Sequence, residues 1–141
     1  MWVVKALLRF QAILCIRAAY SDCDDDYLDP EVRTRLRKVL LKKESQYDCE
    51  LEERAADFIS TYTLHCDPEK PLNVTKLVGS LNYYEKSFLH KATYFKSQNE
   101  LYDHMKNVKE DVGCANLPQK PYGYICLIEE SLFVEDLIGP W

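Results

Sequence analysis

The sequence predicts an all-α fold, a small disulfide-stapled bundle of four to five helices. Three observations favour it: apolar residues recur at helical spacing along most of the chain, helix-starting residues precede several of these stretches, and the cysteines are widely spaced. The 141 residues are 47% hydrophobic and 29% charged, a balance typical of a folded chain long enough to bury one core.

Two helices are expected in the first half of this bundle. The first should begin at Pro30, because Asp29 can accept hydrogen bonds from free backbone N–H groups and proline suits the first helical position. It should run to about residue 45. The second is expected over residues 47–64, with an apolar stripe made of Leu51, Ala55, Phe58, Ile59 and Tyr62.

Two further helices are expected after a Pro-containing loop. The third should start between residues 73 and 75 and reach about Phe95, weakened slightly by Gly79. Ser97 and Glu100 form a capping box that predicts the start of the fourth helix, and Gly113 would cap its C-terminus.

The last part of the chain is strongly apolar and its pattern is ambiguous. Residues 116–123 contain two prolines and a glycine and are expected to form a loop. Residues 124–138 could form a helix or a strand, and the spacing of Leu127, Ile128, Leu132 and Leu137 favours a buried helix.

Residues 1–21 are interpreted as a cleavable targeting segment, followed by a single helical domain over residues 22–141. The segment contains Lys5, Arg9, Arg17 and no acid, and small residues precede an acidic stretch at Asp22. A secretory signal peptide is preferred, and a mitochondrial presequence is the alternative. The net charge of −5 argues against nucleic-acid binding, and no stable membrane insertion is expected.

Five cysteines would remain after cleavage, so one should stay free or form a disulfide-linked dimer. Cys114 and Cys126 bracket the Pro-containing loop and could pair locally. Cys23 could reach Cys66 where two antiparallel helices end, which leaves Cys49 as the candidate for the unpaired thiol. Cys49 and Cys66 could not pair with each other, since a helix between them would hold them about 25 Å apart.

Asn73, Val74 and Thr75 form an N-glycosylation sequon, so Asn73 is a candidate for glycosylation. A glycan there would accompany secretion and would exclude the mitochondrial alternative.

No motif for catalysis, for a cofactor or for a metal ion was found. We therefore expect a non-enzymatic protein without a cofactor. Tyrosine is abundant, with ten residues, and its apolar ring and polar tip suit a binding face. The candidate binding face consists of Tyr83, Tyr84, Tyr94 and Tyr102.

These features predict a secreted protein that binds another, unidentified protein, such as a receptor or a host or tissue factor, through its helix faces. The alternative is an extracellular carrier of a small hydrophobic ligand. Insect odorant-binding proteins are similar in being acidic, helical and disulfide-stapled, but the Cys-x3-Cys pair of that family is missing here. A carrier would need an enclosed apolar cavity of about 300 Å³ or more.

Overall fold

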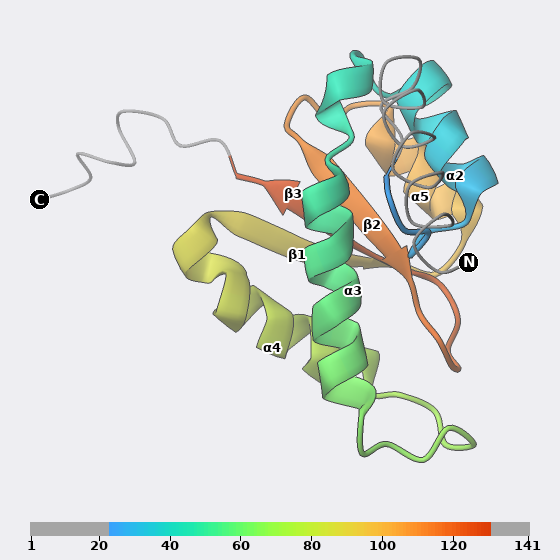
Figure 1. Ribbon diagram of the computed structural model, residues 1–141, viewed down its shortest axis with the longest axis vertical. Helices are drawn as coiled ribbons and strands as arrows, with labels where there is room; N and C mark the ends of the chain where they lie inside the picture. Colours follow the sequence, from blue (N-terminus) through green and yellow to red (C-terminus); the bar gives the residue numbers. More distant parts are fainter. Residues whose placement is uncertain (1–22, 131–141) are drawn as a thin grey trace, which may run out of the picture.

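The computed structural model describes residues 23–130. The predicted targeting segment and residues 131–138 of the last predicted helix lie outside the described residues. Over this range the protein is mixed α/β, with helices packed on both faces of a three-stranded antiparallel sheet (Figure 1). The prediction of an all-α bundle, and with it the likeness to helical odorant-binding proteins, is therefore wrong.

The three strands all lie in the second half of the described chain, after α4. The bounds of the helices and strands, in chain order, are α2 (Pro30–Arg35), the π-helical turn η1 (Leu36–Leu40), the 3-10 turn η2 (Glu44–Gln46), α3 (Cys49–Thr63), α4 (Val74–Glu85), the 3-10 turn η3 (Lys86–Phe88), β1 (His90–Phe95), α5 (Gln98–Met105), β2 (Val112–Asn116) and β3 (Tyr124–Glu129). None of these helices combines the length and apolar character needed to cross a membrane.

The strand order is β1-β3-β2, so β3 lies in the centre of the sheet. Its side chains alternate between two cores, as the period of a strand requires. Tyr124 and Cys126 pack with α2 and α5, whereas Ile125 and Leu127 pack with α3 and α4. Because β3 is covered on both faces, its sequence is an almost unbroken apolar run, which explains why it could be mistaken for a buried helix.

The expected helix starts are confirmed, because capping is a local interaction. The Asp29 side chain accepts a hydrogen bond from the Glu31 N–H, Asn73 accepts one from Lys76 and Ser97 accepts one from Glu100. The second predicted helix also matches α3 closely.

The third helix does not reach Phe95. Leu89 adopts a left-handed conformation (φ 60°), which ends the helical segment, and the chain continues as β1. Ala92 and Phe95, both within the span of the predicted third helix, lie on opposite faces of the sheet.

The fourth helix, α5, ends at Met105 and not near Gly113, which lies in β2. A Cβ atom on Gly113 would lie 2.3 Å from the backbone nitrogen of Glu52 and 2.5 Å from the backbone oxygen of Asp48. Gly113 therefore allows α3 to approach the sheet closely and does not cap a helix.

Both edges of the sheet are covered by other parts of the chain. At β1, the Asn82 amide accepts from the Ala92 N–H (2.7 Å) and donates to the Ala92 carbonyl (3.2 Å). At β2, the Asp48 N–H donates to the Val112 carbonyl over 2.8 Å, and the Cys114 N–H donates to the Tyr47 hydroxyl over 3.3 Å. These contacts limit pairing with strands of other chains.

Two disulfide bonds are present in the described residues. Cys114 and Cys126 lie opposite each other on β2 and β3 and are bonded. Cys23 pairs with Cys49, so the predicted Cys23–Cys66 pair and the free Cys49 are wrong. The segment before α2 runs beside the N-terminal turn of α3, which leaves Cys66, beyond the other end of α3, free and exposed. Such bonds are typical of proteins that fold in an oxidising, extracellular-type environment.

Candidate functional site

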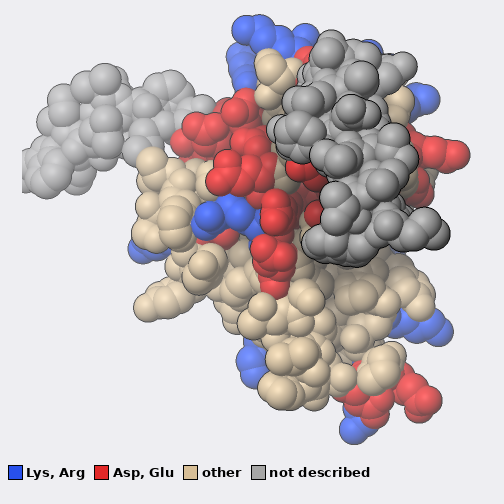
Figure 2. Space-filling view, in the orientation of Figure 1, with Lys and Arg blue, Asp and Glu red and all other residues tan. Residues whose placement is uncertain are grey.

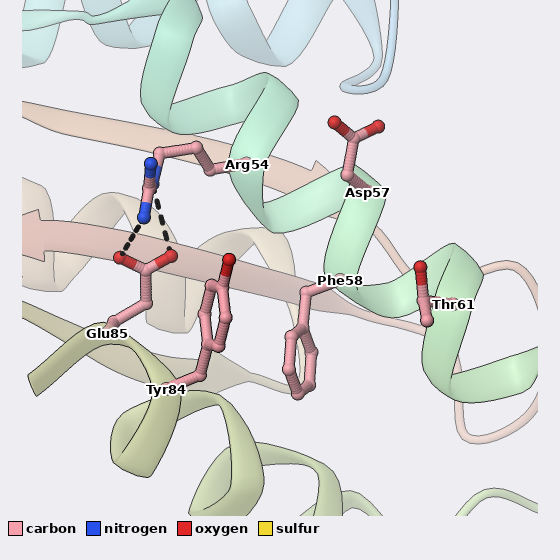
Figure 3. Close-up of a pocket in the computed structure, with 6 residues that line it drawn as sticks. All are labelled: Arg54, Asp57, Phe58, Thr61, Tyr84 and Glu85. Carbon is pink, nitrogen blue, oxygen red and sulfur yellow. Dashed lines mark hydrogen bonds and ion pairs between the residues drawn. The ribbon is translucent and has the colours of Figure 1, made fainter.

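The candidate site is a hollow between α3 and α4, which lie on the same face of the sheet (Figure 1). It measures about 350 Å³ and opens to solvent. Figure 3 shows the side chains that line it: Arg54, Asp57, Phe58 and Thr61 from α3, and Tyr84 and Glu85 from α4.

A row of four aromatic rings follows the junction of the two helices; we call it the aromatic row. The ring of Phe58 lies 6.3 Å from that of Tyr62 and 5.7 Å from that of Tyr84, and Tyr84 lies 6.0 Å from Phe88. Phe58 and Tyr62 both lie on α3, four residues apart, which helical geometry places on one face, whereas Tyr84 lies near the end of α4 and Phe88 on the turn η3 that follows it. Tyr84 is 54% exposed and Phe88 is 48% exposed, so the row is an accessible apolar surface.

One end of the hollow is fixed by a buried carboxylate. Glu85 has no exposed surface, and both of its oxygens are bound by the Arg54 guanidinium, at 3.1 and 3.0 Å. His90 Nδ1 lies 3.0 Å from one of these oxygens. The Arg54 guanidinium also stacks over the Phe88 ring, 4.1 Å from its centroid. These contacts join α3 to α4 at the rim of the hollow and occupy both carboxylate oxygens of Glu85.

The other side of the hollow is acidic. Asp57 points away from the two rings in Figure 3 and continues an exposed line with Glu50 and Glu53 along α3. The charge of Asp25 raises the pKa of Tyr27, and Glu53 and Asp57 act in the same direction, so these acids surround one patch. We call Asp25, Glu50, Glu53 and Asp57 the acidic band. Figure 2 shows acidic side chains over the N-terminal half of α3 and largely uncharged surface below.

The four tyrosines of the predicted binding face do not share one surface. Tyr84 lines the hollow, and Tyr83, its neighbour on α4, is 86% exposed and is not among the lining residues. Tyr94 lies on β1 and donates its hydroxyl hydrogen to the Tyr122 carbonyl over 3.0 Å. Tyr102 lies on α5, under the guanidinium of Arg35, in the other layer.

Three residues of the aromatic row are absent from the predicted binding face. Phe58 and Tyr62 were expected in the apolar stripe of their helix, and Phe88 lies within the span of the longer predicted third helix. The available signal was the spacing of four residues between Phe58 and Tyr62 and between Tyr84 and Phe88. The contact between the two pairs joins different helices, which periodicity along the chain does not reveal.

The sequon residue Asn73 is exposed just before α4. Its side-chain oxygen accepts the capping hydrogen bond from the Lys76 N–H over 3.1 Å. An N-glycan is attached through the side-chain nitrogen, so the cap and a glycan are compatible.

A second buried charge cluster lies between α2 and α3. The Glu52 carboxylate accepts hydrogen bonds from Arg33 Nε (3.0 Å) and Nη2 (2.7 Å) and from the Tyr47 hydroxyl (2.5 Å). Arg33 also binds Asp26 on the segment before α2. Since each charge is paired and Glu52 has no exposed surface, this cluster has a structural role.

Over residues 23–130, no three His, Cys, Asp or Glu side chains gather closely enough to hold a metal ion. No protein-family model matches the chain, and neither a curated protein nor a solved structure matches it. The hollow between α3 and α4 is therefore the feature of the described residues from which a function is proposed.

Proposed function

We propose that this protein is secreted, has no enzymatic activity, and binds another protein through the hollow between α3 and α4. The observation that carries the proposal is the aromatic row, in which Tyr84 and Phe88 are about half exposed and contact the partly buried ring of Phe58. Tyrosine and phenylalanine are enriched at the centres of protein interfaces, because large rigid rings bury much area at a low entropic cost.

The carrier alternative has weaker support. The hollow is large enough for a small ligand, but it opens to solvent and does not enclose a cavity. A carrier of hydrophobic ligands requires an enclosed, mostly apolar cavity.

Secretion is supported by the two disulfide bonds and by the exposed position of Asn73. The mitochondrial alternative would leave the sequon unused. Production in a eukaryotic secretory host, with intact mass before and after glycosidase treatment, tests this part of the proposal. A glycan that disappears in an Asn73→Gln variant supports it, whereas retention of an unprocessed, unglycosylated chain contradicts it.

Protein binding is tested with the disulfide-bonded protein immobilised on beads and exposed to extracellular fluid of the source tissue. Wild type is compared with a Tyr83→Ala/Tyr84→Ala variant, and bound proteins are quantified by mass spectrometry. The matched control is Tyr122→Ala, which removes a tyrosine that is 61% exposed on the β2–β3 loop. A partner retained by wild type and by the control but lost from the α4 variant supports the proposal. Identical profiles for all three proteins would overturn it.

A further inference from the structure

We infer that the partner segment that enters the hollow is basic as well as apolar: a protein segment with a large apolar side chain flanked by Lys or Arg. This inference rests on the proposed function and names the partner class of the same site. Its basis is the continuity of the aromatic row with the acidic band, which meet at Asp57.

The only positive charge that lines the hollow is already neutralised. Arg54 is bound bidentately by Glu85 and covered by the Phe88 ring, so an acidic side chain on a partner would find no free cation among the lining residues. Asp57, in contrast, lies exposed at the rim. The charge that the hollow presents to an incoming segment is therefore negative.

The acidic side chains of α3 extend this negative charge along the helix. Glu50, Glu53 and Asp57 are three and four residues apart, so they form one stripe on the helix, about 10 Å long. Phe58 follows Asp57 directly and turns toward α4, where it meets Tyr84. A partner that inserts an apolar side chain beside Phe58 and Tyr84 would thus place its neighbouring residues over Asp57 and Glu53.

The aromatic row and the acidic band would contribute to binding in different ways. The aromatic row supplies the apolar contact area, on which affinity mainly depends. The acidic band selects partners by charge and speeds their encounter, since exposed ion pairs act mainly on specificity and association rate. The same charges repel nucleic acid and anionic membranes, which leaves a basic protein segment as the occupant that complements both the row and the band.

The test is a selection from a random peptide library displayed on phage, with the disulfide-bonded protein as target. Peptides enriched on wild type are synthesised, and their affinities are compared with those for Glu53→Lys/Asp57→Lys. The control is Glu31→Lys/Asp103→Lys, which makes the same charge change on α2 and α5. We expect enriched peptides to combine a large apolar residue with net positive charge, and to bind the acidic-band variant about tenfold more weakly than the control.

The Tyr83→Ala/Tyr84→Ala variant, once its unfolding curve shows that it folds, distinguishes a failure of this inference from a failure of the proposed function. Peptides that need these tyrosines but are neutral or acidic, or that bind both charge variants equally, overturn the inference and leave the proposed function standing. Enriched peptides whose binding does not depend on these tyrosines overturn the proposed function as well.

Discussion

Glu52 is a buried residue on which several polar contacts of the N-terminal half converge. It joins α3 to Arg33 of α2 and to the Tyr47 hydroxyl, which in turn accepts a hydrogen bond from the Cys114 N–H of β2. A single carboxylate therefore connects two helices with the edge of the sheet. Removing one member of a buried ion pair leaves the other charge without compensation, which costs far more than the pair itself contributes.

We expect Glu52→Gln to lower the free energy of unfolding by about 3–5 kcal/mol, because the buried Arg33 guanidinium would lose its buried counter-charge and keep only its ion pair with the exposed Asp26. The control is Asp26→Asn, which removes the charge of the other ion-pair partner of Arg33. Because the Asp26 side chain is 62% exposed, this change should cost about 1 kcal/mol or less. Urea unfolding curves measure both. Equal losses for the two variants would contradict the structural role of Glu52.

Tyr47 should make stability decrease at alkaline pH. Burial, together with the negative charge of Glu52 and the hydrogen bond to it, raises its pKa well above the ordinary value of 10.0. The folded protein therefore holds this proton after the unfolded chain has lost it. Its contribution to stability is complete below pH 10.0 and is lost as the pH rises from there toward the folded-state pKa.

The measurement compares Tyr47→Phe with the unchanged tyrosine, both in a Cys66→Ala background so that no exposed thiol attacks the disulfides. We expect the free energy of unfolding to fall less steeply above about pH 10 in Tyr47→Phe, since phenylalanine has no proton to lose. Parallel pH profiles for the two proteins would show that Tyr47 does not titrate differently in the folded state.

At the scale of elements, the starts of helices could be predicted but their ends could not. Asp29, Asn73 and Ser97 cap helices through hydrogen bonds to residues two or three positions away, so the signal is local. The end of α4 depends on Leu89 and on the pairing of His90 with Glu129, a residue far along the chain. Strand pairing of this kind is invisible to helical periodicity.

The candidate site, too, could be predicted only in part from the sequence. The abundance of tyrosine predicts Tyr84 as a binding residue, and Tyr84 lines the hollow. The bond between Arg54 and Glu85 joins residues 31 positions apart on different helices, and only the packing of α3 on α4 creates it.

Two glycines test how closely the elements pack. Gly113→Ala should destabilise the protein strongly, because the new Cβ would lie 2.3 Å from a backbone atom of α3, which must then move. Gly79→Ala is the matched control: nothing lies within 4 Å of its Cβ position in α4, so it should stabilise by about 0.5–1 kcal/mol. Thermal unfolding of the two variants should shift in opposite directions. A neutral Gly113→Ala would contradict the close approach of α3 to β2.

At the scale of the whole molecule, the two disulfide bonds connect different parts of the fold. Cys114–Cys126 joins two strands that already pair, whereas Cys23–Cys49 attaches the segment before α2 to α3, next to the Arg33–Glu52 pair. The first bond closes a loop of 12 residues and the second a loop of 26. Because loop entropy grows only with the logarithm of length, the two bonds should stabilise the fold to a similar extent.

We expect Cys23→Ala/Cys49→Ala and Cys114→Ala/Cys126→Ala each to lower the free energy of unfolding by about 3 kcal/mol, measured by urea unfolding without reductant. Cys66→Ala is the control and should change stability by less than about 0.5 kcal/mol, because Cys66 is exposed and unpaired. Hydrogen exchange should distinguish the two double variants. Without the Cys23–Cys49 bond, the amides near Tyr27 should lose protection from exchange, while the amides that pair β1 with β3 should remain protected. A loss no larger than that of Cys66→Ala would mean that hydrophobic packing on both faces of the sheet holds the fold without the crosslinks.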